Sequence, residues 1–202
     1  MNRIILTTFF CIAMMNLFAQ PINDDCAGII DLGVAPICPF PDTFNNVNAS
    51  LSMVFSDPDD NVPSCFIGGT IDRDVWFQFT VPLNMVDFMI TVTGVNGMNG
   101  SISQPQIAVY RGDCLVDELV ELNCASSNPA SSAVTLELVG LTPNLTYFLR
   151  INDWSANATP NWGDFVICVE ELAQTYLMGQ EPGSNACSGT LFDSGGPDND
   201  YM

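Results

Sequence analysis

The stretch Val75-Trp-Phe-Gln-Phe-Thr-Val81 alternates two kinds of side chain along its length. Successive side chains of a β-strand point to opposite faces, so one face of this segment carries only valine and phenylalanine. That face predicts a strand lying on a hydrophobic core. The other face, with Trp76, Gln78 and Thr80, is expected to be half exposed to solvent.

Similar short segments recur on both sides, separated by Asn, Gly, Pro and Asp, with no sustained helical period. The expected strands are Ala49–Phe55, Val75–Val81, Val86–Thr93, Gln106–Tyr110, Leu115–Leu122, Ala133–Val139, Leu145–Ile151 and Asp164–Glu170. Leu141-Thr-Pro-Asn144 has the residues of a tight turn, which predicts that the strands before and after it are adjacent and antiparallel. The pattern predicts an all-β protein, a two-sheet antiparallel β-sandwich of jelly-roll-like type.

The N-terminal segment has the features of a secretory signal peptide. Arg3 gives a positive start, residues 4–18 are mostly apolar, and Ala19 closes a plausible cleavage site. The apolar run is short for a membrane span, so no membrane insertion is expected after its removal. We therefore expect export of the chain to the cell surface or beyond it, with residues 1–19 removed.

The chain has a formal net charge of −19, and loss of Arg3 with the signal peptide would take it to −20. Such an acidic chain argues against nucleic acid and anionic lipid as partners, because their phosphates would be repelled. Cations, neutral glycans or another protein remain as partners. Acidic charge spread over loops also serves solubility alone.

Residues 192–197, Phe-Asp-Ser-Gly-Gly-Pro, resemble the segment around the catalytic serine of chymotrypsin-like proteases. A serine becomes a nucleophile only when a neighbouring base takes its proton. The chain contains no histidine, and its four basic residues are all arginines. Ser194 is therefore not expected to be catalytic, and we expect no enzymatic activity.

Seven of the eight cysteines follow the signal peptide. In an exported chain most of them are expected to form disulfides, with one left over. Composition changes between Glu171 and Ala186, where Gln, Glu, Pro, Gly, Ser and Asn follow one another closely. We place a domain boundary there: residues 20–172 form the sandwich, and 173–186 form a linker and the first strand of a next domain.

Five elements, in this order and spacing, resemble the bacterial pre-peptidase C-terminal domain, a β-sandwich module. They are residues 23–27, 74–81, 107–114, 141–147 and 165–169. The resemblance implies a module of the secreted and surface proteins of gliding bacteria, often exported by type IX secretion. Such a module would have other domains of the same parent chain as neighbours.

The tail, from Tyr176 through the segment Cys187–Gly196 to Tyr201, resembles the first strand and loop of a CUB-like domain. Ser194 would then lie in a Gly-rich loop. Residues 187–202 are too few for such a domain, so the chain is expected to be truncated.

Six cysteines allow fifteen pairings. The resemblance and proximity along the chain suggest Cys26–Cys168, Cys38–Cys65 and Cys114–Cys124. Cys187 is left unpaired in this fragment.

Acidic loops suggest Ca²⁺ as the metal, because calcium takes six to eight oxygen ligands. Residues 57–68 depart from the EF-hand pattern. Asp24, Asp25 and Asp74 are the candidate ligands in the sandwich, and Asp193 and Asp198 are those of the CUB-like segment.

Two further motifs suggest recognition. Trp154 and Trp162 flank the loop of residues 155–161, where they would either bind glycan or cover the end of the sandwich. Residues 111–113 spell Arg-Gly-Asp, the tripeptide that integrins read, but turn chemistry explains this glycine better.

Together these features predict a non-enzymatic extracellular binding, adhesion or spacer module of a larger protein, with glycan or protein on a surface as its partner. The alternative is an accessory domain of a secreted hydrolase, protease or glycosidase, whose catalytic domain lies outside this chain.

Overall fold

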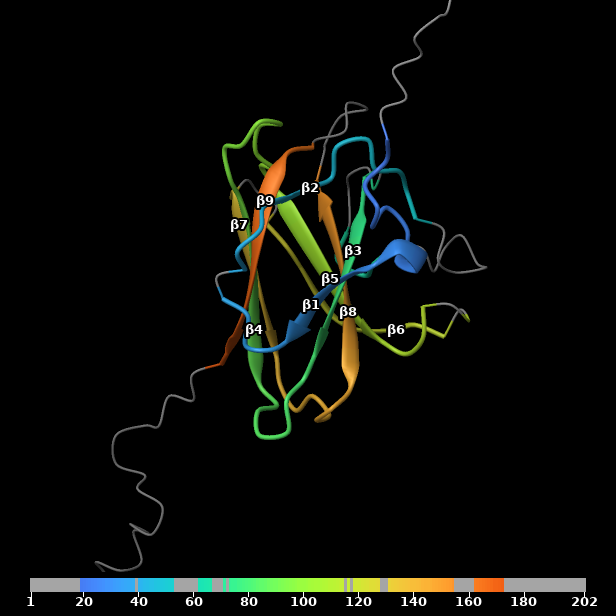
Figure 1. Cartoon of the computed structure of the whole chain (residues 1–202), viewed down its shortest axis with the longest axis vertical. Coiled ribbons are helices and arrows are strands. Elements are labelled where there is room, and N and C mark those ends of the chain that lie inside the picture. The colour runs from blue at the N-terminus through green and yellow to red at the C-terminus, as the bar shows by residue number, and fades with distance from the viewer. Residues whose placement is uncertain are drawn as a thin grey trace, which may run out of the picture. The chain divides into compact units, whose positions relative to one another are not determined.

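The computed structural model describes residues 19–38, 40–52, 62–66, 71, 73–114, 116, 118–127, 131–154 and 162–172. These residues form one short 3-10 helix and nine strands (Figure 1). In chain order the elements are η1 Cys26–Gly28, β1 Ile30–Val34, β2 Phe44–Asn45, β3 Val75–Thr80, β4 Phe88–Gly94, β5 Pro105–Arg111, β6 Val120–Ser126, β7 Ala133–Leu138, β8 Thr146–Asp153 and β9 Asp164–Glu171. Within the described part of the chain, no helix has the length and apolar composition needed to cross a membrane. The compact unit to which these elements belong ends at Glu171.

The strands form two packed sheets, which confirms the expected sandwich. Sheet A has the order β1-β3-β8-β5-β6, and sheet B has the order β2-β9-β4-β7. Four antiparallel pairs, β2 with β9, β3 with β8, β4 with β7 and β5 with β6, make the chain one long hairpin whose tip is β5–β6. The hairpin is rolled so that its successive pairs fall in alternate sheets, which is the jelly-roll arrangement. β1 departs from it by joining β3 in parallel.

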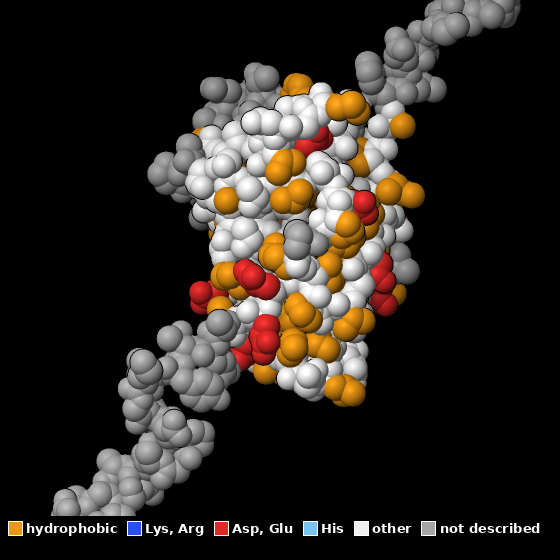
Figure 2. All heavy atoms as spheres, turned by 60° about the vertical axis from the view of Figure 1, so that its left-hand side comes forward, with side chains coloured by type: hydrophobic (Ala, Val, Ile, Leu, Met, Phe, Trp, Pro, Cys, Tyr) orange, Lys and Arg blue, Asp and Glu red, His pale blue; other side chains and the backbone are white. Residues whose placement is uncertain are grey.

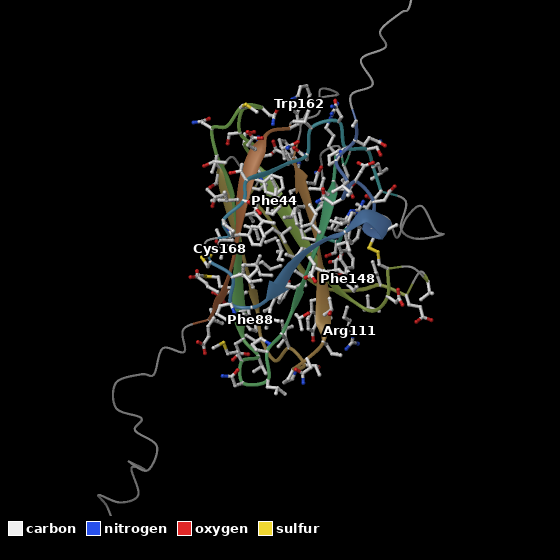
Figure 3. All side chains as sticks on the ribbon, in the orientation of Figure 1. Phe44, Phe88, Arg111, Phe148, Trp162 and Cys168 are labelled. Carbon is white, nitrogen blue, oxygen red and sulfur yellow. A yellow bond between two sulfur atoms is a disulfide. The ribbon has the colours of Figure 1, made fainter. Side chains whose placement is uncertain are left out.

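The core between the sheets follows from the alternation of side chains. Val75, Phe77 and Phe79 of β3 are fully buried, and so are Phe88 and Ile90 of β4. The two sheets meet through edge-on aromatic contacts, such as that of Phe79 with Phe88, whose ring centroids are 6.2 Å apart. In Figure 3, Phe44 and Phe88 point into the space between the sheets.

The outer face of sheet A is also covered, contrary to expectation. Trp76 is fully buried there, in a second apolar cluster with Tyr110, Phe66, Cys26 and others. The segment before β1 lies along β3, because Trp76 N–H donates to Asn23 O at 2.8 Å and Asn23 Nδ2 donates to Trp76 O at 3.0 Å. We call the segments of residues 21–29 and 62–66 that lie over this face the cover.

Some expected strands differ from the observed ones. Residues 49–52 form no strand, since Ala49 N–H bonds to Asn46 O in a turn, and residues 53–55 lie outside the described part of the chain. The strand expected at Leu115–Leu122 begins instead at Val120. The expected strands omitted β1 and β2, which are only five and two residues long.

The expected pairing of residues 133–139 with 145–151 is wrong. β7 belongs to sheet B and β8 to sheet A, so the connection between them crosses the sandwich. Gly140, at φ 69°, and Asn144, at φ 59°, turn the chain in this crossing. A turn signal marks a change of direction but not whether the next strand pairs or crosses.

The three expected disulfides are also wrong, because the cysteines pair as Cys26–Cys114, Cys38–Cys168 and Cys65–Cys124. Cys38 reaches Cys168 because the preceding residue, Ile37, forms an antiparallel bridge with Val169.

The other two disulfides join the cover to the β5–β6 hairpin. Cys124 lies opposite Ala108, a member of the outer cluster, and it therefore faces Cys65 of the cover rather than Cys114. Cys187, Ser194, Asp193 and Asp198 lie outside the described residues.

Candidate functional site

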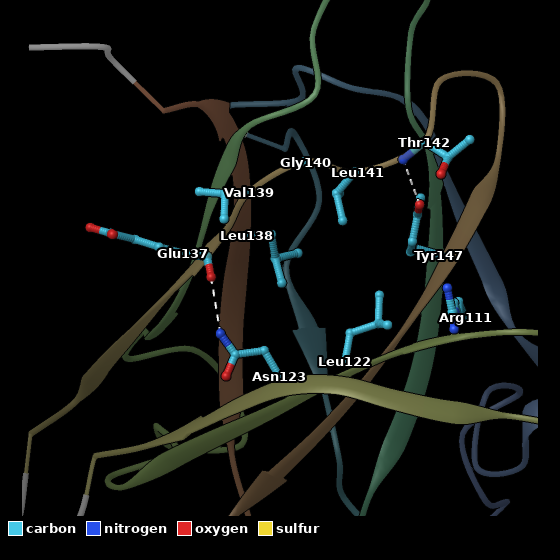
Figure 4. Close-up of a pocket in the computed structure, with 10 residues that line it drawn as sticks. All are labelled: Arg111, Leu122, Asn123, Glu137, Leu138, Val139, Gly140, Leu141, Thr142 and Tyr147. Carbon is cyan, nitrogen blue, oxygen red and sulfur yellow. Dashed lines mark hydrogen bonds between the residues drawn. The ribbon is translucent and has the colours of Figure 1, made fainter.

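A groove lies where the last strand of sheet A, β6, approaches the last strand of sheet B, β7 (Figure 4). Its volume is about 280 Å³. Its walls come from β6, from the end of β7 and the crossing that follows it, and from single residues of β5 and β8. The groove therefore exists only because the edge strands of the two sheets, consecutive in the chain, meet across the sandwich.

A β-bulge at Leu122 shapes one wall. In the β5–β6 pair, Val109 lies opposite Asn123 while Tyr110 lies opposite Glu121, so Leu122 is the extra residue. A bulge bends its strand and redirects side chains. Leu122, 36% exposed, thus joins Asn123 in lining the groove.

The opposite wall is apolar. Leu138 and Leu141 are buried in it, and Val139 is 71% exposed at its rim. Leu141 and Val139 flank Gly140, whose positive φ allows the chain to turn here.

Two hydrogen bonds hold the walls in place. Asn123 Nδ2 donates to Glu137 O at 3.1 Å and so links β6 to β7 (Figure 4). Thr142 N–H donates to Tyr147 Oη at 2.8 Å, which fixes the crossing against β8. The Glu137 side chain points away from the groove in Figure 4. The two hydrogen bonds therefore fix β6, β7 and the crossing relative to one another.

Arg111 supplies the positive charge of the groove. It ends β5, is exposed and lines one end of the groove beside Tyr147. Within the described residues one salt bridge is found, and it does not involve Arg111. Of the three described arginines, Arg150 is buried and Arg73 lies over the Trp162 ring, 4.6 Å from its centroid. Arg111 is therefore the cation most available to a ligand.

The glycine after Arg111 has a structural role. Gly112 has φ 123°, and a Cβ built on it would lie 2.0 Å from Glu118 O. Only glycine fits this turn, which agrees with the structural role expected from the sequence. Arg111 and Asp113 on either side of it are exposed.

A buried salt bridge lies under the cover. Arg150 Nε is 2.9 Å from Asp74 Oδ2, and both side chains are fully buried. Ser52 N–H donates to Asp74 Oδ1 at 3.0 Å, and the Arg150 guanidinium lies 5.3 Å from the ring centroid of Trp76. Trp76 Nε1 in turn donates to Ser52 Oγ at 2.8 Å. Isolated buried charges are strongly unfavourable, so this pair and its hydrogen bonds are a structural unit.

Two of the three expected calcium ligands are engaged in other interactions. Both carboxylate oxygens of Asp24 accept hydrogen bonds from Ser50, and Asp74 pairs with Arg150. Partial burial, with the neighbouring charges of Asp24 and Asp74, raises the pKa of Asp25. The ligand atoms of Asp24, Asp25 and Asp74 do not converge into a metal-binding group.

One other group brings three potential metal ligands together in the described part of the chain: Cys38, Cys168 and Glu170. The two cysteines are joined in a disulfide, and a disulfide sulfur is not a thiolate ligand. This group is therefore explained by the covalent link.

Two buried carboxylates organise the loop before β5. Asp153 accepts N–H groups of Ser103 and Gln104, and Asp164 accepts both the backbone and the side-chain amide of Asn99. Burial raises the pKa of Asp153, and the two backbone hydrogen bonds oppose this shift. Both carboxylates therefore serve to fix the conformation of the loop before β5.

The two candidate tryptophans have different environments. Trp162 is 41% exposed and lies against Arg73, whereas Trp154 is partly buried and its backbone N–H donates to Gln104 O at 2.9 Å. The loop of residues 155–161 between them lies outside the described residues. Trp162 lies at the end of the sandwich opposite to Arg111 in Figure 3.

The sequence did not reveal the groove. Residues 120–124 alternate without interruption, so the bulge at Leu122 leaves no trace in the pattern. Arg111 was noticed only as part of a tripeptide, and its approach to β7 depends on the tertiary fold.

Comparison with known protein families finds no match for this chain, and a search of curated proteins finds no significant similarity.

Proposed function

We propose that this chain is a non-enzymatic extracellular module of a larger secreted or cell-surface protein, where it serves in adhesion or as a spacer and carries mechanical load. The observation on which the proposal rests is the disulfide Cys38–Cys168, which joins the segment before β2 to the last strand, β9. Disulfides also favour an oxidising, extracellular compartment. The absence of histidine and lysine from the sequence supports a role without acid–base chemistry at neutral pH.

The position of this disulfide determines how force would travel. A pull applied at both ends of the module enters before Cys38 and leaves after Cys168, so the covalent link would bear the load. The 130 residues of separation between the two cysteines would then be shielded from stretching. Such a module would keep its length under tension even when its sheets unfold.

Single-molecule force spectroscopy tests this proposal, with handles at the two ends of the exported chain. Complete reduction should lengthen the unfolded chain by roughly 450 Å, because 130 residues extend at about 3.5 Å each. The variant Cys38→Ser/Cys168→Ser retains Cys26–Cys114, which would then carry the load across a separation of 88 residues. The oxidised, unfolded variant should therefore be longer than the oxidised, unfolded unmodified chain by 42 residues, which is 130 minus 88, or roughly 150 Å.

The variant Cys65→Ser/Cys124→Ser is the matched control. Both of its positions lie between Cys38 and Cys168, so its unfolded length should equal that of the unmodified oxidised chain. An oxidised chain that already extends by its full length would overturn the load-bearing role.

Binding and spacing are separated by a second experiment. Glycan and protein arrays probed with the oxidised chain should give a reproducible ligand if the module acts in adhesion. Arrays without signal, together with the expected force response, would favour the spacer.

A further inference from the structure

We propose that the groove between β6 and β7 binds a short apolar segment of a partner protein that carries a carboxylate, and that Arg111 pairs with this carboxylate. The inference rests on the proposed function as a binding module, and it assigns that function a binding site and a class of ligand.

The size of the groove points to one or two side chains of a peptide. Pockets that enclose whole small molecules or cofactors have volumes of about 300–1,000 Å³. The groove, at about 280 Å³, is at the lower limit of this range, and its lining residues come from both sheets (Figure 4).

The walls favour an apolar occupant. Leu138 and Leu141 are buried in one wall, while Leu122 and Val139 expose apolar surface on opposite sides of the groove. An apolar side chain placed between Leu122 and Val139 would remove the surfaces of both from water, which is the main favourable contribution to such binding.

The charge at one end selects a carboxylate. The Arg111 guanidinium is exposed and lacks a salt bridge among the described residues, and a planar guanidinium pairs best with planar, bidentate acceptors. A phosphate is the other common partner of arginine. With a net charge of −19, the chain would repel a doubly charged phosphate more strongly than a single carboxylate.

Addition of a partner strand is a less suitable mode of binding here. Glu137 O, on the free edge of β7, already accepts a hydrogen bond from Asn123 Nδ2. That acceptor is not available to a further strand, and recognition would depend on side chains placed in the groove.

The test uses two capped dipeptides as probes, acetyl-leucyl-aspartate amide and its neutral counterpart acetyl-leucyl-asparagine amide. They are titrated to millimolar concentration into the ¹⁵N-labelled oxidised chain and followed by NMR. The aspartate probe should shift the amide signals of Leu122, Val139 and Gly140, and the asparagine probe should bind at least five-fold more weakly.

Two arginine variants separate the site from a general charge effect. Arg111→Gln should reduce affinity for the aspartate probe at least five-fold and make the two probes equivalent. Arg73→Gln removes the same charge at a position outside the groove and should leave affinity unchanged. Because Arg111 is exposed, its replacement should leave the rest of the spectrum intact.

Three results would overturn the proposal: no shifts at groove residues, equal binding of the two probes, or binding that survives Arg111→Gln. The force measurement does not involve Arg111. A normal force response with a negative titration would therefore refute the groove alone, whereas an abnormal force response would refute the load-bearing module.

Discussion

The outer faces of the two sheets differ, although both belong to the same sandwich. On sheet A, Trp76 and Arg150 are fully buried beneath the cover, which two disulfides hold in place. On sheet B, Thr91 and Thr135 contact each other through their hydroxyls at 3.2 Å and remain partly or fully exposed. Figure 2, which brings the β7 and β4 side forward, shows small groups of hydrophobic side chains among polar and acidic ones, and no visible Lys or Arg.

The difference shows that the polar groups on the outer face of sheet A are satisfied by other protein groups, whereas those on the outer face of sheet B are satisfied by solvent. β7 alternates buried and exposed residues along Ala133–Leu138, and its exposed polar groups are solvated. β3 has large side chains on both faces, so its outer face had to be covered by another segment. Asp74 and Arg150, which both hydrogen-bond to Ser52, are also fully buried and must then satisfy each other.

The largest effect is expected from breaking the salt bridge under the cover. Asp74→Asn keeps the acceptor for Ser52 N–H but leaves the Arg150 charge without its partner. The free energy of unfolding should fall by about 3 to 5 kcal/mol, as measured by urea denaturation of the oxidised chain.

Glu137→Gln, on the exposed surface of β7, is the matched control and should change stability by less than about 0.5 kcal/mol. If Asp74→Asn cost no more than this control, the salt bridge would have no stabilising role and the contrast between the faces would fail.

A smaller effect is expected from Tyr110 at alkaline pH. Burial raises the pKa of Tyr110 to about 12, with the Arg150 charge lowering it and the Glu121 charge raising it. Between pH 10 and about 12 the unfolded chain loses the phenolic proton first, so the stability of the fold falls as pH rises through this range.

Over that range the unmodified chain should lose about 2 kcal/mol more stability than Tyr110→Phe, as measured by brief urea titrations under oxidising conditions. Parallel losses in the two chains would show that the Tyr110 hydroxyl is not protected by the cover.

The smallest effect is expected on the outer face of sheet B. Thr91→Val removes one hydroxyl from the contact with Thr135 and keeps the β-branched shape that favours a strand. Because the partner hydroxyl can bond to water, the midpoint of thermal unfolding should change little, corresponding to less than about 0.5 kcal/mol. A loss comparable to that of Asp74→Asn would mean that this face is also covered.

Strands with strong alternation were predicted well. The bounds of six strands fall within two residues of the expected ones: β3, β4, β5, β7, β8 and β9. The reason is that the pattern of apolar residues that marks a strand lies within one short stretch of the sequence. Alternation did not reveal whether the second face is buried. Trp76 showed this limit, since its burial depends on Asn23 and Ser52, which lie at least 24 residues away.

The pairings of distant residues could not be predicted. Cys38 meets Cys168 only because Ile37 forms a bridge with Val169 of β9, and Arg111 reaches the groove only because β6 and β7 approach each other. The expected calcium ligands failed to converge for the related reason that Asp74 had a nearer partner in Arg150, 76 residues away in the chain.

The sequence by itself determined the all-β class, most of the strands, the need for glycine at residue 112 and the dependence on disulfides. These are properties of consecutive residues and of composition, set by backbone geometry and by the removal of apolar side chains from water. The tertiary structure alone decided which cysteines pair, which face of β3 is covered, where the buried charges meet and that a groove opens beside Leu122. Those features depend on how a long hairpin rolls into two sheets, because the roll places residues side by side that are separated by scores of positions in the chain.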